Sequence, residues 1–151
     1  SYIWRLFGKS FHLWPRWLVK LVTKIHTRLI RFNHTKIGSI ILGGNILLLE
    51  TKGRNTNLIR KVPLTYVELS DSYLVAASYG GRDVHPEWFL NIQINNGNVV
   101  VNKKKYKIKA EVIPEDEIEK YWNKLIKIYP TFNLYRARSK RSIPLVKLIR
   151  I

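Results

Sequence analysis

Apolar residues recur at intervals of three and four between residues 15 and 32, which is the spacing of one face of a helix. Pro15 suits the first helical turn, where a missing N–H costs little, and Asn33 suits the position that ends the helix. The apolar face comprises Trp17, Leu18, Leu21, Val22, Ile25, Leu29 and Ile30, and the opposite face carries Arg16, Lys20, Lys24 and Arg28. The pattern therefore predicts a basic amphipathic helix over residues 15–32.

From residue 45 onward, short apolar or alternating runs are separated by turn residues, a pattern typical of antiparallel strands. Turn residues at 52–57 predict a first hairpin, and three lysines at 103–105 form the turn of a second. Asn96-Gly97 is a tight-turn signal ahead of the second hairpin, and Gly80-Gly81 ends the third strand. The predicted strands cover residues 45–51, 58–69, 73–79, 99–102, 106–113 and 143–151.

Three further helical segments interrupt these strands. Residues 85–95 and 132–139 form two of them, and the third starts at Pro114, where three acids follow and suit the positive end of the helix dipole. A parallel sheet needs a crossover helix after nearly every strand, so this order favours an α+β fold with an antiparallel sheet, closed or partly closed into a small barrel. We expect an N-terminal helical part at 1–36 and the barrel domain at 37–151.

Charge adds a second constraint. The 151 residues carry 27 Lys plus Arg against 10 Asp plus Glu, a formal charge of +17, and Glu50 is the first carboxylate. The basic helix could pack on the domain, lie on an anionic membrane or bind nucleic acid. We expect no nucleic-acid partner, because the aromatic residues fit buried stripes and no single-strand-binding motif accompanies them.

The hydrophobic pattern also indicates where the protein is located, through the segments that could span a membrane or direct secretion. The longest apolar stretch, residues 39–49, is too short for a spanning helix, which needs roughly 20 residues. The first residues lack the unbroken apolar core of a secretory signal. We expect a cytoplasmic protein, peripheral on the inner face of the cell membrane if the basic helix binds lipid.

Few residues support chemistry by the protein alone. The chain has no Cys, and its four His, at 12, 26, 34 and 85, include no metal-binding i, i+4 pair beside a carboxylate, so we expect no metal. Ser78 has no His or acid nearby in the sequence to activate it. Any redox chemistry would therefore come from a bound cofactor.

Arg54 and Arg60 flank the turn of the first hairpin. Two guanidinium groups and the exposed amides of a turn can form a concave site for phosphate or carboxylates. A solvated basic hairpin is the alternative interpretation.

Five short motifs occur in a fixed order. They are Leu-Leu-Glu-Thr-Lys-Gly-Arg at 48–54 with Arg60 and Pro63-Leu64; Ala76-Ala77-Ser78 with Gly80-Gly81; Pro86-Glu87-Trp88-Phe89-Leu90-Asn91; Tyr129-Pro130 with Tyr135; and Arg141-Ser142-Ile143-Pro144. Over about residues 14–151 the chain closely resembles the deazaflavin-dependent nitroreductase family. The resemblance implies a split β-barrel that binds coenzyme F420, a deazaflavin delivering hydride to quinones, nitroaromatics or activated alkenes.

The resemblance also implies a coenzyme site. Arg54 and Arg60 would hold the phosphate and the oligoglutamate tail, and Lys52 and Lys61 would strengthen the positive field. The other implied coenzyme contacts are Pro63, Tyr66, Ala76, Ala77, Ser78, Tyr79, Trp88 and Asn91. For Trp88, packing in the core is the alternative.

For catalysis the resemblance implies Tyr129, Tyr135 and Ser78, with the electron acceptor between Tyr129, Phe132, Tyr135 and Trp17. Related reductases read Tyr-x-x-Tyr-x-x-Tyr here, so Phe132 lacks a hydroxyl that could orient the acceptor or relay a proton. A lipid-soluble quinone is the acceptor we expect.

The sequence leaves three alternative functions open. A related split barrel could bind flavin mononucleotide, it could bind haem, or the protein could carry F420 without turnover. Both a monomer and a dimer are compatible with the pattern.

Overall fold

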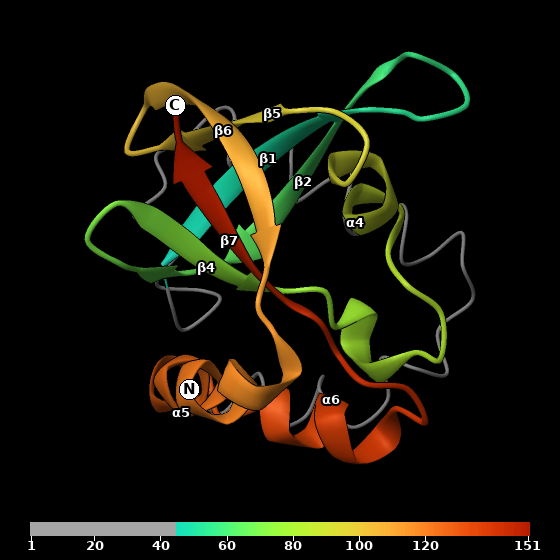
Figure 1. The fold of residues 1–151 in the computed structure, drawn as a ribbon, viewed down its shortest axis with the longest axis vertical. Coiled ribbons are helices and arrows are strands. Elements are labelled where there is room, and N and C mark those ends of the chain that lie inside the picture. The colour runs from blue at the N-terminus through green and yellow to red at the C-terminus, as the bar shows by residue number, and fades with distance from the viewer. Residues whose placement is uncertain (1–44) are drawn as a thin grey trace.

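The computed structural model describes residues 45–151, which form one antiparallel seven-stranded sheet with the strand order β2-β1-β5-β6-β7-β4-β3 (Figure 1). The helix predicted over residues 15–32, with Trp17, lies outside the described residues, and the domain division at residue 36 stays a prediction. The strands are β1 (Ile46–Lys52), β2 (Ile59–Thr65), β3 (Val67–Glu68), β4 (Ser72–Ala76), β5 (Gly97–Val101), β6 (Lys104–Val112) and β7 (Leu145–Arg150).

The two edges of this sheet are joined by a single residue. β2 and β3 lie at opposite ends of the strand order, yet only Tyr66 separates them in the chain. The N–H of Tyr66 still donates to the Asn45 carbonyl at 3.0 Å beside β1, and Val67 then pairs with Leu74 of β4. The sheet therefore curls into a half-barrel, which shortens its exposed edges. The prediction of one strand over 58–69 was wrong, because the chain changes edges at Tyr66.

Side chains from the inner face of the curled sheet form the first hydrophobic cluster. Helix α4 (Glu87–Ile92) contributes Trp88, Phe89 and Ile92 to it. The sheet residues of this cluster are Leu47, Leu49, Tyr66, Tyr73, Val75, Ala77, Val99, Val101, Ile108, Val146 and Leu148. Their alternation along the strands is the period-2 pattern that the sequence shows.

A second hydrophobic cluster lies on the outer face of β4 and β7. Helices α5 (Ile118–Ile128) and α6 (Phe132–Arg138) cover this face, with Leu125 fully buried and Trp122 and Phe132 beside it (Figure 1). A 3-10 turn, η3 (Glu115–Glu117), precedes α5 and carries the acids that predict a helix start. No helix among residues 45–151 is long and apolar enough to cross a membrane.

Several predicted boundaries were wrong. β4 ends at Ala76 instead of residue 79, because the chain enters a 3-10 turn, η2 (Tyr79–Gly81), with positive φ at all three residues. Helix α4 is shorter than the predicted 85–95, and β7 is shorter than 143–151. The second hairpin turns at Asn102 and Lys103, whose φ values are 48° and 67°, so β6 begins inside the predicted turn.

Gly97 does not serve the predicted tight turn. It is the first residue of β5, and a Cβ atom there would lie 2.7 Å from the carbonyl oxygen of Glu50. The absence of a side chain lets β5 approach β1 closely.

Glu50 is a buried carboxylate on the outer face of β1. Only 5% of the residue is exposed, Lys61 Nζ lies 2.6 Å from Oε1, and Lys105 pairs with Oε2. Burial by itself raises the pKa of Glu50, but the hydrogen bonds and charges of Lys105 and Lys61 outweigh it and hold the pKa below its usual value. The ionised form is therefore the one that stabilises the fold.

We expect Glu50→Gln to lower the free energy of unfolding by about 1–2 kcal/mol at pH 7. Because the folded-state pKa is depressed, this loss should be constant above the unfolded pKa near 4.5 and should vanish as pH falls through the folded value. Urea unfolding between pH 3 and 7 measures it. Glu111→Gln is the control, since that carboxylate is 52% exposed and 3.6 Å from Lys147. An equal loss at pH 3 and pH 7 would contradict the assignment.

Candidate functional site

One edge of β4 is paired only in part. β4 pairs with β7 from Ser72 to Ala76, whereas β3 pairs with Tyr73 and Leu74 alone. Beyond Leu74 the neighbouring chain has passed through Tyr66 into β2. Among residues 45–151 this interruption leaves an unpaired strand edge between β4 and the end of β2. We call it the β2–β4 seam, bounded by Pro63 and Tyr66 on one side and by 76–78 on the other.

The predicted seam residues do not all share one face. Ala77 is fully buried in the first hydrophobic cluster, whereas Ala76 belongs to the second cluster beside α5 and α6. Tyr66 is 5% exposed and its ring meets Tyr73 edge to face at 5.2 Å. The seam thus presents backbone and methyl groups, which allow a flat ligand to approach the strand closely.

The predicted cation site is divided by the alternation of β2. Arg60 lies in register with Thr51 and shares the inner-face positions of Val62 and Leu64. Lys61 points to the outer face, where it pairs with Glu50. Arg60 and Lys61 therefore cannot contact one anion from the same side. Lys52 follows Glu50 by two residues and shares the outer face, so Arg60 and Lys52 are both exposed but on opposite faces.

Arg54 and Asn91 are brought together, as the predicted site requires. The Arg54 backbone N–H donates to Asn91 Oδ1 at 3.0 Å, and Asn91 is only 4% exposed. The Arg54 guanidinium also pairs with Glu87 at 2.5 Å. Sequence reasoning gave Glu87 no role at the site, although it stands in one of the quoted motifs.

Trp88 packs in the hydrophobic core, which is the alternative that the sequence left open for it. It is 7% exposed within the first cluster, and its ring lies 6.0 Å from that of Phe89. Core packing accounts for this burial, although the same helix delivers Asn91 to the hairpin.

Tyr129, Phe132 and Tyr135 form a cluster of edge-to-face rings. Phe132 is the middle ring, 5.1 Å from Tyr129 and 5.7 Å from Tyr135. Burial raises the pKa of both tyrosines, and their hydroxyls hydrogen-bond each other. At neutral pH both are protonated and can donate hydrogen bonds, and the raised pKa makes each a weaker acid than a free tyrosine. Phe132 and Tyr135 are 5% and 8% exposed, so Tyr129 is the more accessible member.

The turn after β4 connects this ring cluster to the seam. Ser78 is 9% exposed, and Tyr79 has a left-handed φ of 49° with the Arg82 guanidinium 5.2 Å from its ring. A Cβ atom on Gly81 would lie 2.7 Å from the Tyr135 carbonyl oxygen. The chain after Ser78 is therefore packed against the backbone of α6. Arg141, which hydrogen-bonds this turn, is a second residue to which sequence reasoning gave no role.

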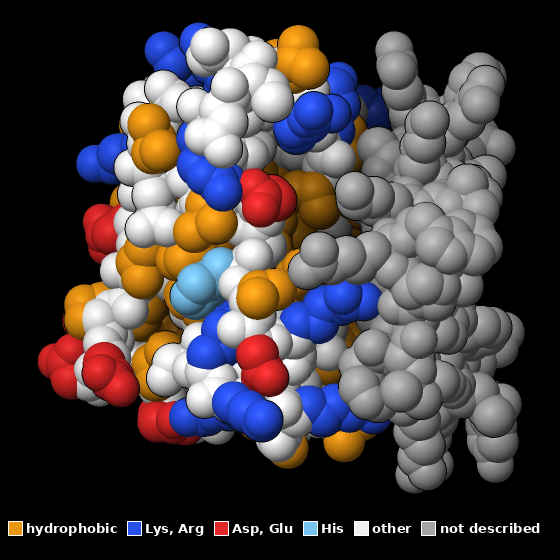
Figure 2. Space-filling model, turned by 90° about the vertical axis from the view of Figure 1, so that its right-hand side faces the viewer, with side chains coloured by type: hydrophobic (Ala, Val, Ile, Leu, Met, Phe, Trp, Pro, Cys, Tyr) orange, Lys and Arg blue, Asp and Glu red, His pale blue; other side chains and the backbone are white. Residues whose placement is uncertain are grey.

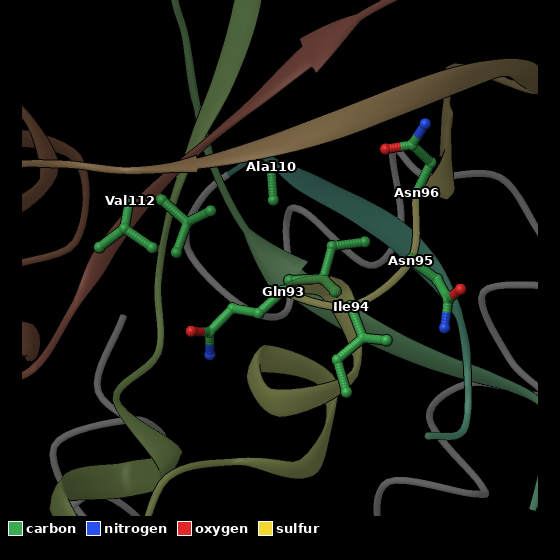
Figure 3. Close-up of a pocket in the computed structure, with 8 residues that line it drawn as sticks. Gln93, Ile94, Asn95, Asn96, Ala110 and Val112 are labelled. Carbon is green, nitrogen blue, oxygen red and sulfur yellow. The ribbon is translucent and has the colours of Figure 1, made fainter. Parts of the chain in front are cut away.

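Two cavities lie away from the seam. One of about 270 Å³ is lined by the residues after α4 and by Ala110 and Val112 of β6 (Figure 3). Another of about 510 Å³ is lined by the turn before β4 and by Tyr121, Lys124 and Lys147. Neither is lined by a residue that the resemblance assigns to the coenzyme.

The unpaired edge of β4 exposes backbone groups, and the hairpin at the other end of β2 carries the cations Lys52, Arg54 and Arg60. Backbone groups can hydrogen-bond a flat polar ligand, and cations can bind an anionic one.

Comparison with known proteins agrees with this chemistry. The family model described as F420H(2)-dependent quinone reductase matches residues 22–149. An F420H(2)-dependent quinone reductase of Mycobacterium tuberculosis (strain ATCC 25618 / H37Rv) is 31% identical over 144 residues, covering 89% of this chain and 97% of that protein.

Solved structures give the same result. A structure described as an F420-H2 dependent reductase is 30% identical with a TM-score of 0.62, covering 68% of this chain and 92% of its own. Another, described as a domain-swapped dimer, is 28% identical with a TM-score of 0.64, covering 87% and 96%. The predicted α+β split-barrel fold is confirmed, and the chain belongs to the F420H(2)-dependent quinone reductase family.

Proposed function

We propose that the protein is an F420-dependent oxidoreductase that reduces a quinone with the reduced deazaflavin held along the β2–β4 seam. Family membership supports the coenzyme and the acceptor class. The observation that carries the proposal is the unpaired edge of β4 beside a basic hairpin. The bound coenzyme supplies the hydride. The chain supplies binding, orientation and a proton source.

The hairpin between β1 and β2 binds the negatively charged tail of the coenzyme. Lys52 and Arg60 are exposed at its end, and Arg54 is oriented by Asn91 and Glu87. Lys and Arg side chains outnumber Asp and Glu by 27 to 10 in the chain, and both kinds are visible on the face shown in Figure 2. A surplus of positive charge accelerates the encounter with a multiply charged anion. Lys61, neutralised by Glu50, contributes mainly to the fold.

Reduction of a quinone to a quinol takes one hydride and one proton. Tyr129 is the group we assign to proton delivery, because it is protonated, more exposed than Tyr135 and hydrogen-bonded to it. Phe132 has no proton to give, so the relay has two members instead of three. Tyr135 lies behind Tyr129 and holds its hydroxyl in place.

Fluorescence titration with oxidised F420 tests coenzyme binding. We expect the wild type to bind and Arg60→Ala to bind about tenfold more weakly, because a charge-assisted contact is lost. Arg136→Ala is the matched control, since Arg136 lies on α6 and pairs with Glu119. Failure of the wild type to bind F420 would contradict the proposal. An absorption spectrum of flavin mononucleotide or haem in the purified protein would instead identify that group as the cofactor.

Steady-state reduction of a menaquinone analogue tests the proton source. We expect Tyr129→Phe to lower kcat at least tenfold with unchanged coenzyme affinity, because general acid catalysis commonly contributes that much or more. Tyr121→Phe on α5 is the control, since that ring lies against Lys147 outside the cluster. An unaltered kcat in Tyr129→Phe would assign the proton to water. Tight coenzyme binding without turnover in the wild type would indicate a carrier.

We further propose that an anionic membrane surface is the place where the acceptor is met, since a lipid-soluble quinone resides there. The basic helix predicted over residues 15–32 supports this. Sedimentation with vesicles containing anionic lipid should capture the protein at low salt and release it at high salt. The double variant Lys20→Glu and Lys24→Glu should reduce capture. Absence of binding to anionic vesicles would contradict membrane association and leave the redox proposal intact.

A further inference from the structure

Arg141 makes an unusual set of contacts in the segment that leads into β7. Its Nη2 donates to the carbonyls of Ala77 at 2.9 Å and Ser78 at 3.3 Å, and its Nε donates to the Arg82 carbonyl at 3.0 Å. Nη1 donates to the Ser142 carbonyl at 3.1 Å. Among residues 45–151 the guanidinium donates its hydrogen bonds to peptide carbonyls, and the Asp83 carboxylate interacts with it through charge alone.

Arg141 contacts the carbonyls of Ala77 and Ser78. Each of these carbonyls shares a peptide bond with the N–H of the next residue, Ser78 or Tyr79. All peptide bonds of the described chain are trans, so the N–H of each unit points away from its C=O. Ala77 directs its N–H toward Pro144, on the β7 side, and its C=O toward Arg141. The N–H of Ser78 therefore points to the other side of β4, which is the β2–β4 seam.

Among residues 45–151 the N–H groups of Ser78 and Tyr79 have no hydrogen-bond acceptor, while Gly81 N–H bonds back to the Ser78 carbonyl at 2.9 Å. A cation at the carbonyl end of a peptide polarises it and strengthens its N–H as a donor. Arg141 thus acts on two peptide units whose N–H groups have no acceptor in the described part of the chain.

The conformation of this turn also depends on Arg141. Tyr79, Gly80 and Gly81 have φ values of 49°, 67° and 80°, and the left-handed conformation is unfavourable for the non-glycine residue Tyr79. Arg141 fixes both ends of the turn through Ala77 and Arg82. The Asp83 carboxylate accepts the Lys140 N–H at 2.8 Å and ties the two segments together once more.

We propose that Arg141 is a positioning residue of the coenzyme site, which fixes and polarises the peptides at Ser78 and Tyr79 so that their N–H groups donate to acceptor oxygens of the bound deazaflavin. The inference rests on the proposed function. It predicts that affinity for the coenzyme depends on a side chain that faces away from the seam.

The first test uses the full-length wild type and F420. In ¹H–¹⁵N spectra the amide signals of Ser78 and Tyr79 should shift on addition of oxidised F420. If the coenzyme binds and neither signal moves, the inference is overturned and the proposed function stands. If the coenzyme does not bind at all, both fail together.

The second test uses variants. Arg141→Lys keeps the charge but cannot bridge Ala77 and Arg82, so we expect at least tenfold weaker F420 binding per folded molecule, with the folded fraction measured by circular dichroism. Arg136→Lys is the matched control and should bind as the wild type does. In Arg141→Ala, millimolar guanidine should restore part of the affinity, whereas equal sodium chloride should not. Wild-type affinity in Arg141→Lys would overturn the inference, as would a loss of affinity only in proportion to lost folded protein.

Discussion

The passage of the chain through Tyr66 is the constraint on which the molecule depends. One residue links the two edges of the sheet, so the curl of the half-barrel and the interruption beside β4 have a common origin. A fully paired β4 would have no free backbone on that side, and an open sheet would leave two long edges exposed. The chain segment that closes the sheet therefore also leaves the edge of β4 unpaired, and this edge is where we propose that the coenzyme binds.

The distribution of charge follows from strand alternation. On β2, one cation faces inward and its neighbour pairs with Glu50 on the outer face. Glu87 pairs with Arg54 at the other end of the hairpin. Two carboxylates thus organise part of a strongly basic surface, and Lys52 and Arg60 remain exposed for an anionic ligand. Positive charge favours association with an anionic coenzyme, whereas acidic neighbours fix the positions of Arg54, Lys61 and Lys105.

Much of the fold could be predicted from the sequence, because apolar periodicity and turn residues report local geometry. β1, β6 and α5 lie close to their expected places. The break at Tyr66 could not be found this way, since its ring continues the inward alternation while the backbone changes partner. At the candidate site, Arg54 and Asn91 both stand in the motifs that carry the resemblance, but their hydrogen bond was not predicted from the sequence. The contacts of Arg141 depend on carbonyl positions far along the chain, which no local pattern contains.

The turn at Asn102 and Lys103 has a consequence for the electric field around the molecule. Its two left-handed residues fix the register of β6 against β5, with Lys105 opposite Val100. In this register Ile108 is fully buried while the lysines on either side of it are exposed. A slip of one position would exchange the two sets, because side chains alternate strictly along a strand. The φ angles of Asn102 and Lys103 thus decide whether the Lys side chains of β6 face solvent or the hydrophobic core.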